Sequence, residues 1–230
     1  MLKLISLEIR KHKLAGMLKA VLYANLGLLI FMVLVLFMDQ SEVDRTFESY
    51  AELLDGLFVF VKSVFIIFGA VLLGKLIIDE YRNNTITLLF MYPIPRKKLM
   101  AAKVIVVFLF TMVTIIVSYL ILAALLVGLD AISGIIPGQL TLSLVGSTLA
   151  KLGFGALYAA GISLIPLYIG MRKKSLSATI VSSVLIVSLI SSGFEQFRLG
   201  DLAYVSIALC LLGIAIAYLS IRKVETEDIS

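Results

Sequence analysis

Five short charged clusters divide this chain into six long apolar stretches, and this alternation limits what the chain can fold into. A helix crosses the hydrocarbon core of a bilayer with about 20 apolar residues. Six stretches reach that length: residues 20–38, 56–78, 104–129, 152–171, 176–194 and 202–221. Hydrophobic residues make up 61% of the chain and charged residues only 15%, a balance far more apolar than that of a water-exposed domain. The sequence therefore predicts an all-α, polytopic membrane protein with six transmembrane helices, forming a single transmembrane domain of residues 1–230.

The distribution of positive charge predicts the orientation of these helices. Of the 20 Lys and Arg residues, five precede the first span, five follow the second and two follow the sixth. Three more, Arg172, Lys173 and Lys174, follow the fourth span. The intervening loops carry only Arg45 and Arg198, apart from Lys151 at the start of the fourth span. By the positive-inside rule, both termini are then cytoplasmic. The formal net charge of +5 lies on the same flanks, so anionic headgroups account for it and nucleic acid is not expected as a partner.

Residues 1–19 have the pattern of an amphipathic helix that lies at the inner membrane surface. Leu4, Leu7 and Leu14 recur at helical spacing among basic residues such as Lys3 and Arg10. An apolar stripe beside a basic face is typical of an interfacial helix. The alternative is an extension of the first span that serves only to fix topology.

Reactive groups at membrane depth are almost absent from the sequence. The one histidine, His12, lies in the basic N-terminal segment, no acidic pair lies inside a span, and the one cysteine is Cys210. Metal sites built from paired histidines and Ser–His catalysis are therefore excluded. A GxxxxGK[ST] nucleotide-binding loop is also missing. We expect no enzyme activity, no metal and no cofactor in this chain, which would move or anchor something without covalent chemistry of its own.

The cytoplasmic loop of residues 79–103 is the most informative segment, because 25 residues are far more than a simple turn requires. Its sequence is DEYRNNTITLLFMYPIPRKKLMAAK, in which Thr85 can cap a short helix. The apolar face of that helix would consist of Ile86, Leu88, Leu89 and Met91. A short helix with exposed apolar residues outside the membrane normally docks into a groove of a partner. The alternative is a turn on the membrane surface with these side chains in lipid.

These features resemble the type-2 permeases of ATP-binding-cassette (ABC) exporters. The matching residues are Glu80, Arg82, Thr85, Leu88, Leu89, Pro93, Arg96, Leu99 and Lys103. The basic N-terminal segment LKLISLEIRKHKL is similar to that of the short permeases found with bacteriocin-immunity and cytolytic-peptide exporters of Gram-positive bacteria. The family often has re-entrant helices between its fifth and sixth spans, but here that connection is only residues 195–201.

The resemblance implies a permease subunit in the bacterial cytoplasmic membrane that exports hydrophobic or amphipathic cargo, such as membrane-active peptides. The loop of residues 79–103 would be a coupling helix seated in a separate cytoplasmic ABC ATPase, which holds the ATP and Mg²⁺. The implied contact residues are Glu80, Arg82, Asn84, Thr85, Leu88, Leu89, Pro93 and Arg96. Arg172, Lys173 and Lys174 would form a second contact. A second copy of the chain in a homodimer, or a sister permease, would complete the transporter.

Two other functions are compatible with parts of the sequence. A membrane scaffold that anchors a cytoplasmic partner would explain the docking loop equally well, without transport. An ion-coupled carrier is less favoured, because the spans show no ionisable residues at the depth where such carriers bind ions.

Overall fold

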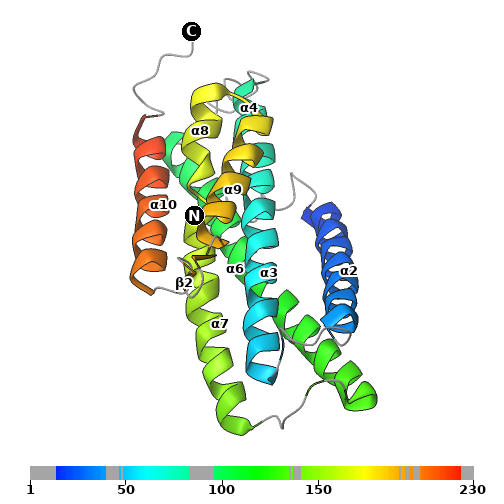
Figure 1. Cartoon of the computed structure of the whole chain (residues 1–230). Coiled ribbons are helices and arrows are strands. Elements are labelled where there is room, and N and C mark those ends of the chain that lie inside the picture. The colour runs from blue at the N-terminus through cyan, green and yellow to red at the C-terminus, as the bar shows by residue number, and fades with distance from the viewer. Residues whose placement is uncertain are drawn as a thin grey trace. The chain divides into compact units, whose positions relative to one another are not determined.

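The computed structural model describes residues 14–39, 47, 49–82, 96–134, 136, 141–191, 193–194, 197–198 and 203–223. Its elements, in chain order, are α2 Leu14–Asp39, α3 Tyr50–Leu73, the π-helix η1 Gly74–Ile78, α4 Asp79–Arg82, α6 Arg96–Ser133, α7 Leu142–Ile162, α8 Pro166–Lys173, α9 Leu176–Ser191, β1 Gly193–Phe194, β2 Phe197–Arg198 and α10 Ala203–Lys223 (Figure 1). Helix therefore accounts for all but four of the residues placed in regular elements. The amphipathic N-terminal segment lies almost wholly outside the described residues, so it stays a prediction.

Five segments are long and apolar enough to cross a membrane: Gly16–Met38, Tyr50–Ile78, Lys97–Ile132, Leu142–Lys173 and Tyr204–Arg222. They correspond to five of the six predicted spans. The remaining one, α9, is apolar but has only 16 residues. At 1.5 Å per residue it is about 24 Å long, against about 30 Å for the hydrocarbon core. The structure thus confirms a polytopic helical membrane protein with five to six candidate spans.

Helix α9 ends earlier than the sequence predicts. The predicted span of residues 176–194 assumed helix through Phe194, but Gly193 and Phe194 form β1. They pair antiparallel with β2, with Gly193 opposite Arg198 and Phe194 opposite Phe197. The physical reason is Gly193, since glycine loses more backbone entropy in a helix than other residues and favours a break.

Two of the charged positions that bound the predicted spans lie inside helices. Helix α6 begins at Arg96 and continues for 38 residues, so it includes the basic cluster that precedes the predicted third span of residues 104–129. Lys and Arg are good helix formers, so the cluster extends the helix. Similarly, α7 begins at Leu142 and runs through Lys151 without a break, where the sequence placed the start of the fourth span.

The fourth apolar segment is interrupted just before Pro166. Ser163–Ile165 form a turn, and Pro166 is the first residue of α8, where its missing N–H needs no partner. The backbone N–H of Ile165 donates to the carbonyl of Ile162 at 3.0 Å, the tight pattern of a 3₁₀ turn. The fourth apolar segment is therefore two helices, α7 and α8.

The described residues group into two compact units, which we treat separately. Unit 1 takes in the described parts of Phe65–Met112 and Leu157–Ser230. In it α10 packs on α7 so closely that a Cβ on Gly213 would overlap the carbonyl oxygen of Gly161. Close approach through small residues is the usual way in which membrane helices pack.

Unit 2 takes in the described parts of Ala15–Val64 and Val113–Ala156. The ring of Phe58 meets that of Tyr119 edge-on, with centroids 5.7 Å apart, and it lies against Gly155 of α7. At the surface of unit 2, the Lys151 ammonium bonds the Asp55 carboxylate at 3.0 Å. Its helices therefore meet through an aromatic contact and an exposed ion pair.

Candidate functional site

A π-helix ends the second apolar segment. In η1 the backbone N–H of Asp79 donates to the carbonyl of Gly74, five residues earlier, where an α-helix would bond four residues back. One extra residue in the turn displaces the neighbouring carbonyls from their usual partners. Such π-turns occur mostly as short insertions, often at functional sites. The one in this chain lies directly before the long predicted loop.

Lys103 of α6 bonds to this π-helix. Its ammonium donates to the carbonyl oxygen of Leu76 at 2.8 Å and to the carboxylate of Glu80 at 2.5 Å. The side chain of Lys103 is 1% exposed and that of Glu80 is 8% exposed. Taking two charges out of water is costly, and their attraction offsets this only where geometry is good and further hydrogen bonds are made. The Leu76 carbonyl, placed by η1, provides such a bond.

The Lys103–Glu80 pair joins the two ends of the predicted coupling loop. Glu80 lies in α4, just before residues 83–95, and Lys103 lies in the second turn of α6, just after them. The ion pair therefore fixes the spacing of the two helices that enter and leave this loop. Any force on the loop would reach both helices at one buried contact.

The turn between α8 and α9 carries the predicted second contact. Arg172, Lys173 and Lys174 are all exposed there. Lys174 has φ 46°, in the left-handed region, and its N–H donates to the carbonyls of Gly170 and Met171. This closes the C-terminus of α8 in the manner of a left-handed cap, and the cations lie where the helix dipole favours positive charge. The result is an ordered, positively charged turn.

Unit 1 brings this turn into contact with the π-helix. Gly74 of η1 lies against the side chain of Leu176 in α9, so close that a Cβ on Gly74 would overlap it. Gly170 of α8 lies in the same way against Thr179 and Ile78. In Figure 1, α8 and α9 run side by side, joined by this turn. The helices that support the two predicted contacts therefore pack on each other through two glycines.

Several residues predicted to contact an ATPase lie outside the described part of the chain. These are Asn84, Thr85, Leu88, Leu89 and Pro93, and their roles stay predictions. Arg82 is the last residue of α4 and Arg96 is the first of α6, so they flank the loop. Glu80 is buried against Lys103 and would act through α6.

Sequence reasoning missed the pairing itself. Lys103 is 1% exposed, but it lies just before the predicted third span of residues 104–129, so the scarcity of ionisable groups inside the spans did not reveal the pair. One signal was present, since Glu80 and Lys103 have opposite charge and flank the two spans that the loop connects. The role of Leu76 had no signal, because a π-helix is not visible in the hydrophobic pattern. Among the described residues, no three His, Cys, Asp or Glu side chains come together as a metal site would require.

Comparison with known proteins assigns the family. Residues 4–191 match the family described as "ABC-2 family transporter protein". The chain is also 39% identical over 227 residues to "Uncharacterized protein YcbO" of Bacillus subtilis (strain 168). The aligned residues cover 99% of this chain and 100% of that protein. No solved structure matches it significantly. The chain therefore belongs to the ABC-2 transporter family, as the membrane component, or permease, of an ABC transporter.

Proposed function

We propose that this chain is the permease subunit of an ATP-driven exporter for amphipathic or hydrophobic peptides, and that the buried Lys103–Glu80 pair transmits force from a separate ATPase. The observation that carries the proposal is the position of the pair at the two ends of the coupling loop. The family match supports a permease, and the basic flanks support an orientation with both termini in the cytoplasm.

The energetics of the pair favour a role beyond stability. Apolar side chains of similar volume often hold a buried position as well as an ion pair, or better. An ion pair instead fixes the relative orientation of the two helices, since the Lys103 ammonium must point at both Glu80 and the Leu76 carbonyl. Directional bonds keep α4 and α6 in one register while the loop is pushed. We therefore assign the pair to coupling.

The second contact fits the same mechanism. The exposed cations of the α8–α9 turn would meet acidic groups of the ATPase. The contact of Leu176 with Gly74 and that of Gly170 with Ile78 would carry its displacement to η1. ATP and Mg²⁺ would be held by the ATPase. Two permease chains, identical or sister, would be needed to enclose a path for cargo. The large apolar area of the spans suits a cargo taken from the membrane, since a hydrophilic solute would need a polar path.

The test compares two double variants in the complex purified from the native host. Glu80→Leu with Lys103→Met replaces the pair by apolar groups, and Asp55→Leu with Lys151→Met does the same to the exposed pair. We expect both to retain the ATPase. Peptide-stimulated ATP turnover should fall on the order of tenfold only in the first, as measured in lipid nanodiscs with an amphipathic cationic peptide.

Two results would contradict the proposal. Equal stimulation in the two double variants would remove the pair from coupling. Co-purification of an ATPase that no peptide stimulates, even in the unaltered complex, would favour the scaffold. Leu88→Asp with Leu89→Asp separates assembly from coupling, because it should release the ATPase and leave the permease folded.

A further inference from the structure

The π-helix η1 differs in cause from the break before Pro166. That break is fixed by the sequence, because proline has no N–H and cannot continue the bonding of an α-helix. The sequence of η1 is GKLII, which contains no proline, and its residues after Gly74 all form α-helix at little cost. The local preference of η1 is therefore α-helical, so contacts with other helices must hold it as a π-turn.

Two contacts hold η1 from different helices. Gly74 lies against the side chain of Leu176 in α9, a contact between apolar groups without a preferred direction. The ammonium of Lys103 in α6 donates to the carbonyl oxygen of Leu76 at 2.8 Å. Because a hydrogen bond depends on direction, the second contact fixes one backbone atom of η1. The Lys103 ammonium is therefore the group that keeps this carbonyl from an ordinary helical partner.

The Leu76 carbonyl has an alternative partner within its own helix. In an α-helix a carbonyl accepts from the N–H four residues later, so the carbonyl of Leu76 would accept from Glu80. If Lys103 left this carbonyl, the backbone N–H of Glu80 would replace it and η1 would become α-helical. One hydrogen bond would be exchanged for another, so the two forms of η1 can have similar free energies.

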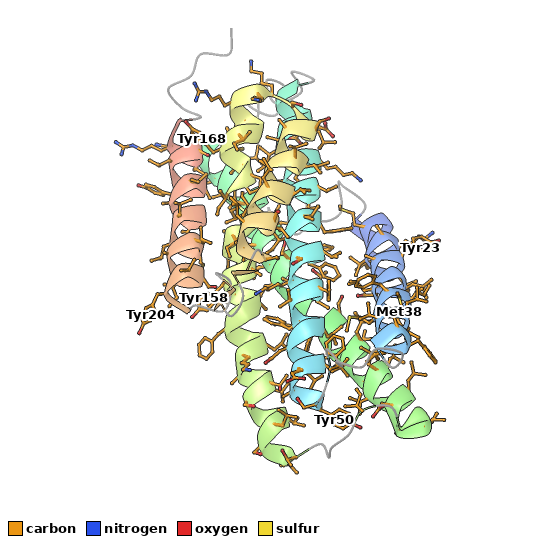
Figure 2. All side chains as sticks on the ribbon, viewed as in Figure 1. Tyr23, Met38, Tyr50, Tyr158, Tyr168 and Tyr204 are labelled. Atoms are coloured by element: carbon orange, nitrogen blue, oxygen red, sulfur yellow. The ribbon has the colours of Figure 1, made fainter. Side chains whose placement is uncertain are left out.

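The π-turn lies where its segment leaves the membrane. It forms the last five residues of the candidate membrane segment Tyr50–Ile78. Within unit 1, Figure 2 shows Tyr168 of α8 and Tyr204 of α10 at opposite ends, with Tyr168 at the end that carries α4 in Figure 1. Tyrosine is enriched at membrane–water interfaces. Water near this end can bond a backbone group that has lost its partner, so exchanging hydrogen bonds costs less there than in the hydrocarbon core.

We infer that η1 is a two-state turn, which winds from π-helix into α-helix when the ATPase pushes the coupling loop; this inference rests on the proposed function. The Glu80–Lys103 bond makes α4 and the start of α6 move together. Their movement draws Lys103 away from the Leu76 carbonyl. Winding adds one residue to the regular helix, which shifts one side of η1 against the other by about 1.5 Å along the axis and about 100° around it. A push on the loop thus becomes a rotation within the second membrane segment.

Deleting one residue tests this inference, because a π-turn holds one residue more than an α-turn. Lys75 is the residue to delete, since it is exposed while the other four residues of η1 are buried. The deletion removes no packed side chain and locks η1 as α-helix. The matched control is Lys75→Ala, which loses the same side chain but keeps the extra residue. Both variants are purified in the complex with the ATPase and placed in lipid nanodiscs.

Hydrogen exchange reads the conformation of η1 without any cargo. In the unaltered complex, the amides of residues 76–80 should exchange about tenfold more slowly with a non-hydrolysable ATP analogue than without nucleotide, because α-helical bonds have closed. The Lys75→Ala complex should show the same change. The deletion variant should exchange slowly in both states. Its peptide-stimulated ATP turnover should fall about tenfold, whereas that of Lys75→Ala should not change.

Three results would overturn the inference. Exchange at residues 76–80 that does not slow with nucleotide in the unaltered complex would show that η1 does not wind, and this result does not depend on whether the deletion variant folds. Full peptide stimulation of the deletion variant would show that coupling needs no winding. Equal loss of stimulation in the deletion variant and in Lys75→Ala would assign the effect to the side chain.

Failure of the proposed function would look different. A complex that no peptide stimulates would contradict the exporter, but slowed exchange at residues 76–80 in that complex would still support the two-state turn. Conversely, loss of stimulation in Glu80→Leu with Lys103→Met, together with full stimulation of the deletion variant, would keep the role of the ion pair and overturn the winding of η1.

Discussion

Lys103 pairs with Glu80 in unit 1, and Lys151 pairs with Asp55 in unit 2. The two pairs have the same chemistry, with ammonium–carboxylate distances of 2.5 Å and 3.0 Å. They differ in burial, since the Lys103 and Glu80 side chains are 1% and 8% exposed while those of Lys151 and Asp55 are 61% and 53% exposed. One molecule thus contains a buried pair and an exposed pair that can be changed in the same way.

Burial changes what happens when one partner of an ion pair is lost. In water, the partner that remains is rehydrated at little cost, and exposed pairs contribute about 0.2–1 kcal/mol. In a buried site the remaining charge has no water to replace its partner, and breaking such a pair costs about 3–5 kcal/mol. Removing one partner of the exposed pair therefore costs little, whereas removing one partner of the buried pair is strongly destabilising.

The largest expected effect is that of Lys103→Met. This change keeps most of the side-chain volume but leaves the Glu80 carboxylate and the Leu76 carbonyl without the ammonium. We expect the free energy of unfolding to fall by about 3–5 kcal/mol. The measurement is denaturant-induced unfolding of the full chain in mixed micelles, followed by far-ultraviolet circular dichroism.

Lys151→Met is the matched control. It removes the ammonium from an exposed pair, so the loss should stay within about 0.2–1 kcal/mol. Equal losses in the two variants would show that water reaches Glu80 and that the burial argument does not hold.

A smaller effect is expected from Gly213→Ala. The added Cβ would overlap the backbone carbonyl oxygen of Gly161, and a backbone atom cannot move aside as the end of a side chain does. Overpacking of this kind costs about 1–3 kcal/mol. Gly153→Ala is the control, because nothing lies within 4 Å of its Cβ position. There the better helix propensity of alanine should raise stability by up to about 1 kcal/mol.

Thermal unfolding in the same micelles checks this pair of glycine variants. If Gly213→Ala were as stable as Gly153→Ala, α10 would not pack on α7 as the structure shows. The difference between buried and exposed sites would then hold for the ion pairs but not for helix packing.

The sequence predicted the spans well because apolar length is a local property. Five of the six predicted spans are candidate membrane segments, and their apolar length depends only on residues close together in the chain. The bounds of the helices are less predictable than those of the spans, since lysine and arginine continue a helix beyond the membrane segment, as they do from Arg96.

The candidate site was only half predictable. The opposite charges of Glu80 and Lys103 at the two ends of one loop can be recognised in the sequence. The packing beside them cannot be recognised, because Gly74 meets Leu176 and Gly170 meets Ile78, contacts that join residues far apart in the chain. The hydrogen bond from Tyr50 to Asp130 has no sequence signal either, because the two residues lie 80 positions apart.

The smallest expected effect is the salt dependence of the two pairs, which tests whether burial causes their difference. Salt shortens the Debye length from about 10 Å at 0.1 M to about 3 Å at 1 M, but ions screen only charges that they can approach. The loss caused by Lys151→Gln should therefore be a few tenths of a kcal/mol at low salt and disappear at 1 M. The loss caused by Lys103→Gln should not change with salt, since Lys103 is 1% exposed. Unfolding at low and high salt measures both. If the two losses fell together as salt rises, ions would have access to Glu80, and the buried pair would no longer hold the two ends of the coupling loop in a protected site.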